Sequence, residues 1–286
     1  MNPTIKRVVI CTHWDPSVTR QALQESLDLL ADRAIEVLAP PAEWDKHGGL
    51  LTQAGAAILA QDGEGIEGVD LCLVLGGDGT MLRGFHLTRD HRIPVAGVNL
   101  GRVGFLTTIL KDDLKRGLGR LLDGDFVEYP ILGLEAELGP QVFKATNDFV
   151  VSKGDRSRPC SLALTINGVT LFEVLCDGVV VGTPAGSSAY SLAAGGPLLG
   201  ISVEAYVISL VAPHAVGVRP VVAAPRDILE VINTDEDADC HIDADGERLA
   251  VLGPGNTLRV KTSPAMTSLA LLEGDSLYRH FRDRLL

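Results

Sequence analysis

The sequence predicts two domains: an α/β N-terminal domain, in which helices flank a parallel sheet, and a C-terminal all-β, sandwich-like domain. Strand-like and helix-like segments alternate over residues 1–125, which is the pattern of a parallel sheet covered by helices. Past residue 125 helical periodicity is scarce, and short apolar segments follow one another between turn residues. We therefore expect domains at 1–125 and 126–272, followed by a C-terminal helical strap at 273–286.

The composition is that of a globular protein in a reducing compartment. No apolar run approaches the ~18 residues of a membrane span, and the N-terminus leads into a strand without the layout of a signal peptide. The five cysteines are scattered, which suits buried thiols better than disulfides or a C-x-x-C zinc site. The formal net charge of −12 disfavours nucleic acid as a partner. We expect a cytoplasmic protein that binds neither membranes nor nucleic acid.

The first elements follow one another closely. A strand is expected at Ile5–Cys11, and Asp15-Pro16 marks a helix start, because Asp caps helices and proline suits their first position. That helix should extend to about residue 31. The segments that follow are a strand at Ala34–Ala39, a loop at Pro40–Gly49 and a helix at Leu50–Ala60.

The stretch Leu71–Thr80, LCLVLGGDGT, organises the N-terminal domain. Five apolar residues predict a buried central strand, two glycines predict a tight turn, and the apolar spacing after Thr80 predicts a helix. The pattern recurs in a strand at Ile93–Asn99, a glycine-bearing turn at Leu100–Leu106 and a helix at Leu110–Leu122. Ligands of parallel sheets bind at the carboxyl ends of the strands, which is where both glycine turns lie.

Asp78 distinguishes the first turn from one that only binds phosphate. A helix N-terminus beyond a glycine turn favours anions, so a carboxylate in the middle of the turn needs an explanation. Asp78 could cap the helix. Alternatively, it orients a metal ion on bound phosphates, or it accepts the proton of an attacking hydroxyl.

The C-terminal half is dominated by strand signals. Asn167-Gly168 between two apolar segments predicts a two-residue hairpin turn, a helical turn is expected near Ser187–Ala194, and Glu273–Leu286 has helical spacing. Strands are expected at Tyr129–Leu138, Gln141–Val151, Ser161–Ile166, Val169–Leu175, Gly178–Gly182, Ala205–Val211, Asp227–Asn233, Arg248–Leu252, Thr257–Lys261 and Met266–Leu272.

Two stretches of this half differ from plain sheet. Asn147-Asp148 interrupts an apolar run where a strand prefers Val or Ile, so a bulge or turn is one interpretation. Asp177–Gly196, DGVVVGTPAGSSAYSLAAGG, combines small side chains with hydroxyls and carries almost no charge. Small side chains permit the close approach of a flat ligand, whereas a surface loop rich in Ser and Ala explains the missing charge poorly.

The sequence resembles the NAD kinase family over nearly its whole length. The motifs are GGDGT at 76–80, NLGRVGFL at 99–106, ND at 147–148 and DGVVVGTPAGSSAYSLAAGGP at 177–197, with weaker matches at Pro213-His214 and Arg219-Pro220. GGDGT alone does not choose a family, because lipid kinases and 6-phosphofructokinases look similar there. The long block at 177–197 does choose.

The resemblance implies transfer of the γ-phosphoryl group of ATP to the 2′-hydroxyl of the adenosine ribose of NAD, which gives NADP. It implies a site between the two domains and a divalent cation, normally Mg²⁺, on the ATP phosphates rather than in a protein metal site. Asp78 matches the general base of this reaction.

The resemblance also implies nucleotide-binding roles. Gly79 would lie against the nucleotide, Phe105 would pack on the adenine, and Asn147 with Asp148 would hold adenine and ribose groups. Asp177 matches a carboxylate near the nicotinamide carboxamide, across a subunit boundary. A further segment accommodates the second adenine-side contact, and it comprises Ser188, Ala189, Tyr190 and Ala193.

Three cationic side chains are further candidates for phosphate contacts. They are Arg83, Arg158 and His214. Each has a plainer interpretation: an exposed helix face for Arg83, an exposed loop for Arg158, and a core or turn position for His214.

Departures from the family pattern leave some points open. Ala193 stands where the family often has Ser, Asp245-Gly246-Glu247 replaces D-G-Q, and Leu175 stands where some relatives carry Arg, so the preference for NAD or NADH is open. Polyphosphate could replace ATP as donor. A lipid or sugar kinase and a non-catalytic pyridine-nucleotide sensor are the alternative functions. The family forms dimers or tetramers, and we expect a homotetramer here, with a homodimer next.

Overall fold

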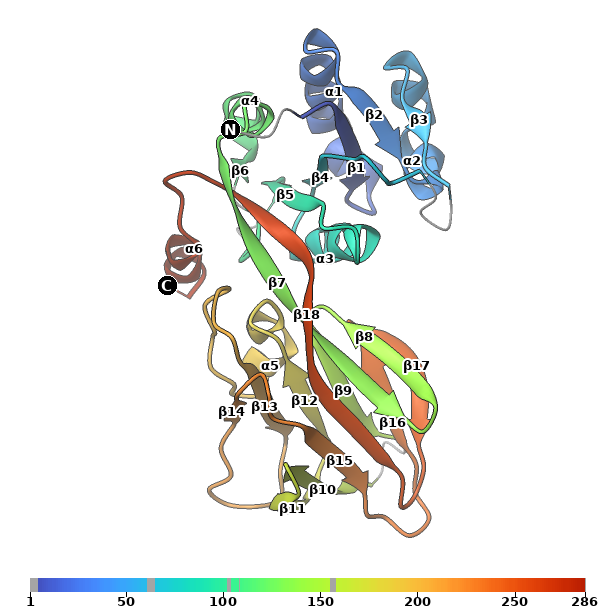
Figure 1. Ribbon diagram of the computed structural model, residues 1–286, viewed down its shortest axis with the longest axis vertical. Helices are drawn as coiled ribbons and strands as arrows, with labels where there is room; N and C mark the ends of the chain where they lie inside the picture. The colour runs from blue at the N-terminus through green and yellow to red at the C-terminus, as the bar shows by residue number, and fades with distance from the viewer. Residues whose placement is uncertain (1–4, 61–64, 102–103, 108, 155–157, 286) are drawn as a thin grey trace. The chain divides into compact units, whose positions relative to one another are not determined.

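The chain folds into two compact units. The computed structural model describes residues 5–60, 65–101, 104–107, 109–154 and 158–285. One unit consists of Met1–Pro130 with Met266–Leu286, and the other of Ile131–Ala265. The chain leaves the first unit within strand β7 (Phe126–Leu138) and returns within strand β18 (Thr257–Leu272) (Figure 1). The second unit is therefore inserted into the first, and residues 266–272 belong to the α/β unit rather than to the β half.

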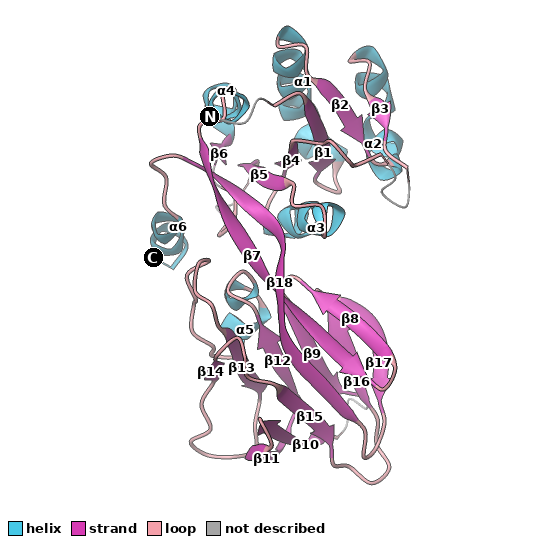
Figure 2. Cartoon of the chain, viewed as in Figure 1, coloured by secondary structure: helices cyan, strands magenta, loops and turns pink. Residues whose placement is uncertain are grey.

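The first unit is the predicted α/β domain with a parallel sheet. Its strands lie in the order β18-β5-β4-β1-β2-β3, and all of these neighbours run parallel. Helices gather in this unit, whereas the regular elements of the second unit are mostly strands (Figure 2). The elements are β1 (Arg7–Thr12), α1 (Pro16–Asp32), β2 (Glu36–Ala39), α2 (Pro41–Gln53), β3 (Ala57–Ile58), β4 (Leu71–Leu75), α3 (Asp78–Thr88), β5 (Pro94–Asn99), β6 (Ile109–Leu110), the 3₁₀ turn η1 (Lys111–Asp113), α4 (Leu114–Leu122) and α6 (Leu277–Leu285).

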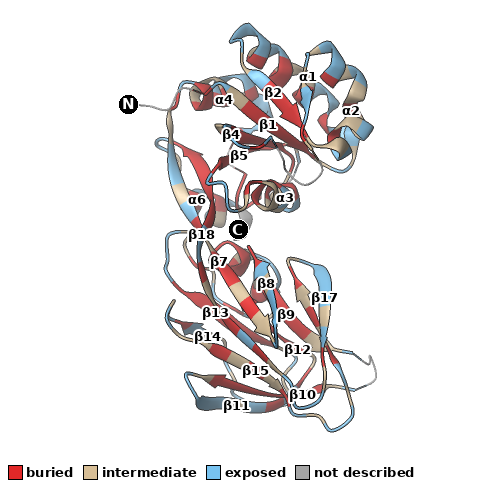
Figure 3. Cartoon of the chain, turned by 45° about the vertical axis from the view of Figure 1, so that its right-hand side comes forward, coloured by how far each residue is buried: buried red, intermediate tan, exposed pale blue. Residues whose placement is uncertain are grey.

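Apolar burial fixes the centre of this sheet. Every residue of β4 and β5 is buried, as expected for central strands of a parallel sheet (Figure 3). Helix α1 begins as predicted: the Asp15 carboxylate accepts the Ser17 N–H at 2.9 Å, and Pro16 occupies the first helical position. Its Leu23 and Leu27 then join the core of the sheet. In the part of the chain that the structure describes, no helix combines the length and the apolar character needed to cross a membrane.

The segment after β2 differs from the prediction. Pro40–Gly49, expected as a loop, lies largely within α2, and the helix expected at Leu50–Ala60 ends at Gln53 and is followed by β3. Pro41 favours the first turn of α2 because its φ is already helical. Gly48 and Gly49 follow a kink at His47, whose φ is −135°. The correction places Glu43 on a helix.

The second unit consists of two sheets that share one core, as predicted for a sandwich-like domain. One sheet has the order β14-β13-β12-β9-β16-β17, and the other contains β11-β10-β15-β18 with β7 and β8. Side chains from both sheets, such as Leu164, Val181 and Ile242, form the core. The elements are β8 (Gln141–Ala145), β9 (Asp148–Lys153), β10 (Cys160–Ile166), β11 (Val169–Cys176), β12 (Gly178–Gly182), η2 (Gly186–Ser188), α5 (Tyr190–Ala193), β13 (Tyr206–Val211), β14 (Val221–Ala223), β15 (Leu229–Asn233), β16 (Cys240–Ala244) and β17 (Glu247–Leu252).

Several strands of this unit depart from the expected bounds. The Asn167-Gly168 hairpin between β10 and β11 is confirmed, with φ of +51° and +80°. The strand expected at Gln141–Val151 is two strands, because the chain bends before Asp148. The two segments expected at 257–261 and 266–272 are one strand, β18. Strands β14 and β16 were not predicted. In β16, buried and half-buried residues alternate as in a strand, but acidic residues on both sides made this segment look like a turn.

Candidate active site

The GGDGT turn (residues 76–80) is the predicted link between a buried strand and a helix. Strand β4 ends at Leu75, and α3 begins at Asp78 with Gly77 as its N-cap. A Cβ on Gly76 would lie 2.3 Å from Thr80 Oγ1 and 2.7 Å from Thr80 Cβ, so any other residue would displace Thr80. The turn therefore brings bare backbone to the N-terminus of an eleven-residue helix, which is a favourable place for an anion.

The Asp78 carboxylate joins the two glycine turns. Its Oδ2 accepts the Phe105 N–H at 2.9 Å, and its Oδ1 accepts the Leu106 N–H at 3.0 Å. A Cβ on Gly104 would lie 2.4 Å from Asp78 Oδ1, so a larger residue there would displace the carboxylate. The cap of α3 is Gly77, without a side-chain hydrogen bond, so the capping interpretation of Asp78 is wrong. Both carboxylate oxygens keep further acceptor capacity.

A pocket of about 590 Å³ lies over this turn, entirely within the first unit. Arg102 and Val103 of the NLGRVGFL motif lie outside the described residues. Asp78, Gly79 and Arg83 line the pocket as predicted site residues. The full lining comprises His13, Trp14, Val18, Gly76, Gly77, Asp78, Gly79, Thr80, Arg83, Asn99, Leu100, Gly101 and Gly104.

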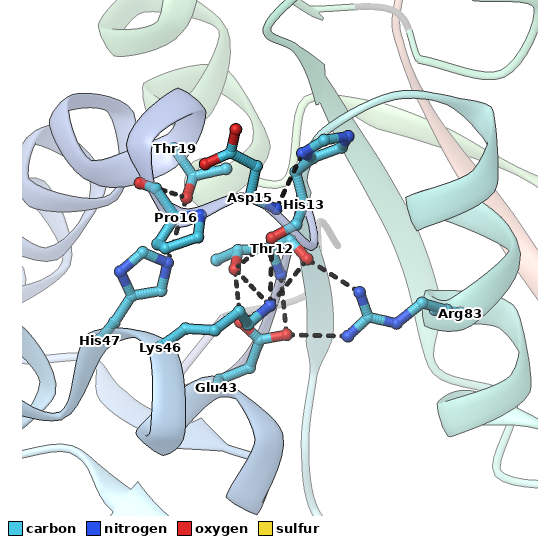
Figure 4. A network of polar contacts seen from close by, with 9 residues as sticks. All are labelled: Thr12, His13, Asp15, Pro16, Thr19, Glu43, Lys46, His47 and Arg83. Atoms are coloured by element: carbon cyan, nitrogen blue, oxygen red, sulfur yellow. Dashed lines mark hydrogen bonds and ion pairs between the residues drawn. The ribbon is translucent and has the colours of Figure 1, made fainter.

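A polar network lies beside the pocket and links β1, α1, α2 and α3 (Figure 4). Arg83 donates to Thr12 O at 3.0 Å and to Glu43 Oε1 at 3.1 Å. Lys46 contacts the other Glu43 oxygen at 2.8 Å. His47 lies at 3.1 Å from Thr19 Oγ1, and burial lowers its pKa. Glu43 is a residue that sequence reasoning missed, because its segment was expected to be a loop.

The backbone of Phe105 takes part in the site, whereas its ring packs against another aromatic side chain. The ring is buried and lies edge-to-face against Phe281 of α6, with 5.5 Å between ring centroids and 72° between planes. Its N–H binds Asp78. The adenine contact of this ring stays a prediction.

The second unit brings Asn147 and Asp148 together with the block at 177–197. Asp148 on β9 pairs with Gly182 on β12, and the Thr183 N–H donates to Asn147 O at 2.8 Å. A Cβ on Gly186 would lie only 2.0 Å from Asn147 O, so the 3₁₀ turn η2 can approach this backbone only through glycine. The polar pair is therefore the corner at which two motifs distant in sequence meet.

Asp245 holds this corner from the turn that follows the neighbouring strand β16, and it was not among the predicted site residues. Its carboxylate accepts the N–H groups of Thr146, Asn147 and Asp148 at 2.8, 2.6 and 3.2 Å, and its own N–H donates to Asp148 O at 3.0 Å. Asp245-Gly246 forms the β16–β17 turn with positive φ at both residues. The Asp-Gly dipeptide in the sequence is a hairpin signal. It does not reveal the contact with Asn147, which lies about a hundred residues earlier.

Two groups at this corner are suited to a ligand. Asn147 Oδ1 is buried and has no hydrogen-bond partner within the described chain, a situation that proteins normally avoid. Asp148 is 5% exposed, and burial, assisted by the Asp245 charge, raises its pKa to about 7. A nucleoside supplies both donors and acceptors that would satisfy such groups.

The raised pKa of Asp148 predicts a pH-dependent stability. Its contribution is fully present below about pH 4 and is lost as the pH rises through about 7, because above that the folded state must hold a buried carboxylate beside Asp245. The free energy of unfolding of the parent should therefore fall between pH 5 and pH 8 by roughly 2–4 kcal/mol more than that of Asp148→Asn. Urea unfolding at both pH values measures this. Asp237→Asn, at an exposed position, is the control and should follow the parent; equal pH dependence in parent and Asp148→Asn would contradict the assignment.

The remaining predicted residues lie at or near the surface of the second unit. Asp177 binds Lys153 at 2.7 Å, and Arg158 lies by Asp237 and Asp235 at 3.5 and 3.8 Å. Their nucleotide contacts stay predictions. Ser188 Oγ donates to Ala185 O, and the other four candidates, all exposed, are Ala189, Tyr190, Ala193 and His214.

Two further serines of the block at 177–197 have structural roles. Ser187 Oγ bridges Pro184 O and the Leu199 N–H, and Ser191 Oγ meets Ser209 Oγ at 2.9 Å. All of these groups are buried. These two buried hydroxyls hold the block in place, whereas the hydroxyl of Ser188 is half-buried.

Comparisons with known proteins agree along the whole chain. The ATP-NAD kinase N-terminal domain model matches residues 15–126, and the ATP-NAD kinase C-terminal domain model matches residues 146–272. The NAD kinase of Aromatoleum aromaticum is 32% identical over 292 residues, covering 100% of this chain and 95% of the relative. That of Gemmatimonas aurantiaca is 34% identical over 237 residues, covering 79% and 82%. The crystal structure of yeast NADH kinase complexed with NADH has the same fold, with a TM-score of 0.84 at 23% identity over 99% of this chain and 88% of that one. The chain belongs to the NAD kinase family.

Proposed function

We propose that this protein transfers the γ-phosphoryl group of ATP to the 2′-hydroxyl of the adenosine ribose of NAD and so forms NADP. The observation that carries the proposal is Asp78: a carboxylate fixed by two backbone N–H groups at a glycine turn, in a pocket, at a helix N-terminus. Membership of the NAD kinase family supports the same reaction.

Positioning and charge stabilisation supply most of the catalysis in phosphoryl transfer. The backbone of the GGDGT turn and the N-terminus of α3 would bind the donor phosphates, with Arg83 as the cationic side chain of the pocket. Asp78 would accept the proton of the ribose hydroxyl as the new bond forms. Its two hydrogen bonds to the next turn keep the carboxylate in one orientation.

A divalent cation, normally Mg²⁺, completes the proposal. Among the described residues no three His, Cys, Asp or Glu side chains gather as a metal site, and we propose that the nucleotide phosphates carry the cation. Asp78 and Asn99, both lining the pocket, are the oxygen donors that would hold it. When bound, the cation neutralises charge on the phosphates.

NAD would be held by the polar corner of the second unit. Asn147 Oδ1 and Asp148 are the groups for its adenosine, and the exposed residues Ala189 and Tyr190 lie in the segment that would accept its second part. Asp177 would face the nicotinamide carboxamide.

Parallel incubations, each with one donor and one acceptor, separate the candidate functions. Purified protein is given ATP, Mg²⁺ and NAD, and NADP is followed by a coupled dehydrogenase. NADP formation supports the proposal. Formation of NADP only with polyphosphate would identify polyphosphate as the donor. Phosphorylation of a lipid or sugar, or binding of NAD without turnover, would replace the proposed function by one of the alternatives.

The proposed place of Ala189 beside the bound nucleotide predicts a selective effect on NAD. Ala189→Leu should weaken NAD binding by ~1–3 kcal/mol, because a larger side chain fills the space of the nucleotide without removing a hydrogen bond. Turnover at saturating NAD should partly recover. Steady-state kinetics with NAD and ATP varied in turn measure this, with Ala224→Leu, at another exposed alanine of the unit, as the control. An unchanged KM for NAD, or equal rises in both KM values, would contradict the placement.

We also propose a homotetramer, with a homodimer as the alternative, in the cytoplasm. All five cysteines are buried free thiols, which supports a reducing compartment. Closed symmetric assemblies are common among enzymes. Light scattering decides the assembly, and a dilute, fully active 30.3 kDa monomer would refute it.

A further inference from the structure

Glu43 is a buried carboxylate that the proposed chemistry does not use. Its side chain is 2% exposed. It accepts from the Thr12 N–H at 3.1 Å, from Thr12 Oγ1 at 2.5 Å, from Lys46 Nζ at 2.8 Å and from Arg83 Nη2 at 3.1 Å (Figure 4). Four donors match the lone-pair sites of a carboxylate, so Glu43 is fully satisfied and held rigidly. Because removing one partner of such a group is costly, the network behaves as a unit.

Lys46 compensates the charge of Glu43 and does not reach the pocket. Its ammonium group also donates to Thr12 O at 3.1 Å, Thr12 Oγ1 at 2.8 Å and His13 O at 3.2 Å. Its side chain is 15% exposed, and it is not part of the pocket lining. With Glu43 and Lys46 cancelling each other, the positive charge of Arg83 remains for another anion.

Arg83 is the member of the network that reaches the pocket. It lies in the second turn of α3 and lines the same pocket as the GGDGT turn, and its side chain is 44% exposed. Two hydrogen bonds, to Thr12 O and to Glu43, fix its planar guanidinium group from the side of β1 and α2. These bonds use two of its five N–H groups, so a phosphate can still be bound through the others.

We propose that Glu43 is a positioning residue, which orients Arg83 so that the guanidinium group meets the phosphate groups of the nucleoside triphosphate. The inference rests on the proposed function of the pocket and adds a residue to it. In a chain of net charge −12, an oriented cation has more effect than a mobile one, because the anionic donor approaches against the overall field; Glu43, Lys46 and Arg83 together carry a net positive charge. A guanidinium group that is already oriented also loses little conformational entropy when it binds a phosphate.

A double-mutant cycle tests the inference. Glu43→Gln should raise the KM for ATP about tenfold, with less than twofold effects on kcat and on the KM for NAD, because it loosens a binding group for the donor. In an Arg83→Ala background, Glu43→Gln should change the KM for ATP by less than twofold. Equal effects of Glu43→Gln with and without Arg83 would overturn the proposal. Glu36→Gln, which removes an exposed carboxylate bound to Arg7, is the control and should leave both KM values unchanged.

A second variant and a binding measurement keep the test independent of folding and turnover. The double variant Glu43→Gln, Lys46→Met removes both charges of the ion pair together, and it should weaken ATP binding as Glu43→Gln does. Calorimetry with ATP and Mg²⁺ alone, without NAD, repeats the cycle on the dissociation constant. Absence of NADP formation by the unmutated protein would refute the proposed function, whereas additive calorimetric effects would refute the role of Glu43. Retained ATP affinity in the double variant would refute it too.

Discussion

Asp78→Asn is expected to lower turnover by at least ~100-fold, the lower end of general-base contributions. The variant cannot accept the proton of the ribose hydroxyl, and its amide NH₂ would face one of the two N–H groups that the carboxylate now binds. NAD affinity should fall far less, because Asn147 and Asp148 lie in the other unit. The measurement is kcat with both substrates saturating, together with thermal unfolding.

Asp70 offers a matched control for this variant. Its carboxylate also accepts two backbone N–H groups in the same unit, from Lys6 at 2.7 Å and Arg7 at 2.9 Å, but it is not part of the pocket lining. Asp70→Asn should therefore cost similar stability and leave kcat unchanged. Near-normal turnover of Asp78→Asn, or an equal loss in Asp70→Asn, would show that Asp78 is only structural.

Gly186→Ala is expected to lower the free energy of unfolding of the second unit by about 3 kcal/mol, the upper range for overpacking. The added Cβ would lie 2.0 Å from Asn147 O and 2.4 Å from Asn147 C, and backbone atoms held by Asp245 cannot move aside cheaply. The KM for NAD should rise with the displacement of Asn147. Urea unfolding followed by circular dichroism measures the loss.

Gly182→Ala is the control for this second prediction. Gly182 lies four residues earlier in the same block, and a Cβ there would meet Val207 Cγ1 at 3.4 Å, an ordinary van der Waals contact. It should change stability by less than ~1 kcal/mol. If both variants unfold at the same urea concentration, η2 does not depend on close approach to Asn147.

Local signals predicted the parts of the site that depend on neighbouring residues. The apolar run before Gly76 predicted β4, and the glycines with Asp78 predicted the turn and the helix start. The interruption of an apolar run by Asn147-Asp148 predicted a bulge or turn, and only the resemblance to the NAD kinase family assigned a nucleotide to this pair.

The supporting carboxylates could not be predicted, because their partners are distant in sequence. Glu43 meets Thr12 and Arg83 only when α2 packs beside β1 and α3, and its segment was expected to be a loop. Asp245 meets Asn147 only through the pairing of β16 with β9. Both residues act through backbone and side-chain contacts that arise from topology rather than from local pattern.

The insertion of the second unit imposes an order on biosynthesis. Residues 131–265 are continuous and can fold as soon as they leave the ribosome, but the first unit receives its last strand only with β18. Ser268 and Leu269 of β18 pair with Pro94 and Val95 at the start of β5. Until β18 is made, the start of β5 therefore has no strand partner on this side, and this lasts while the whole inserted unit is translated. An open edge of that kind is a site for intermolecular pairing. The nascent chain therefore passes through an aggregation-prone stage that ends when β18 closes the sheet.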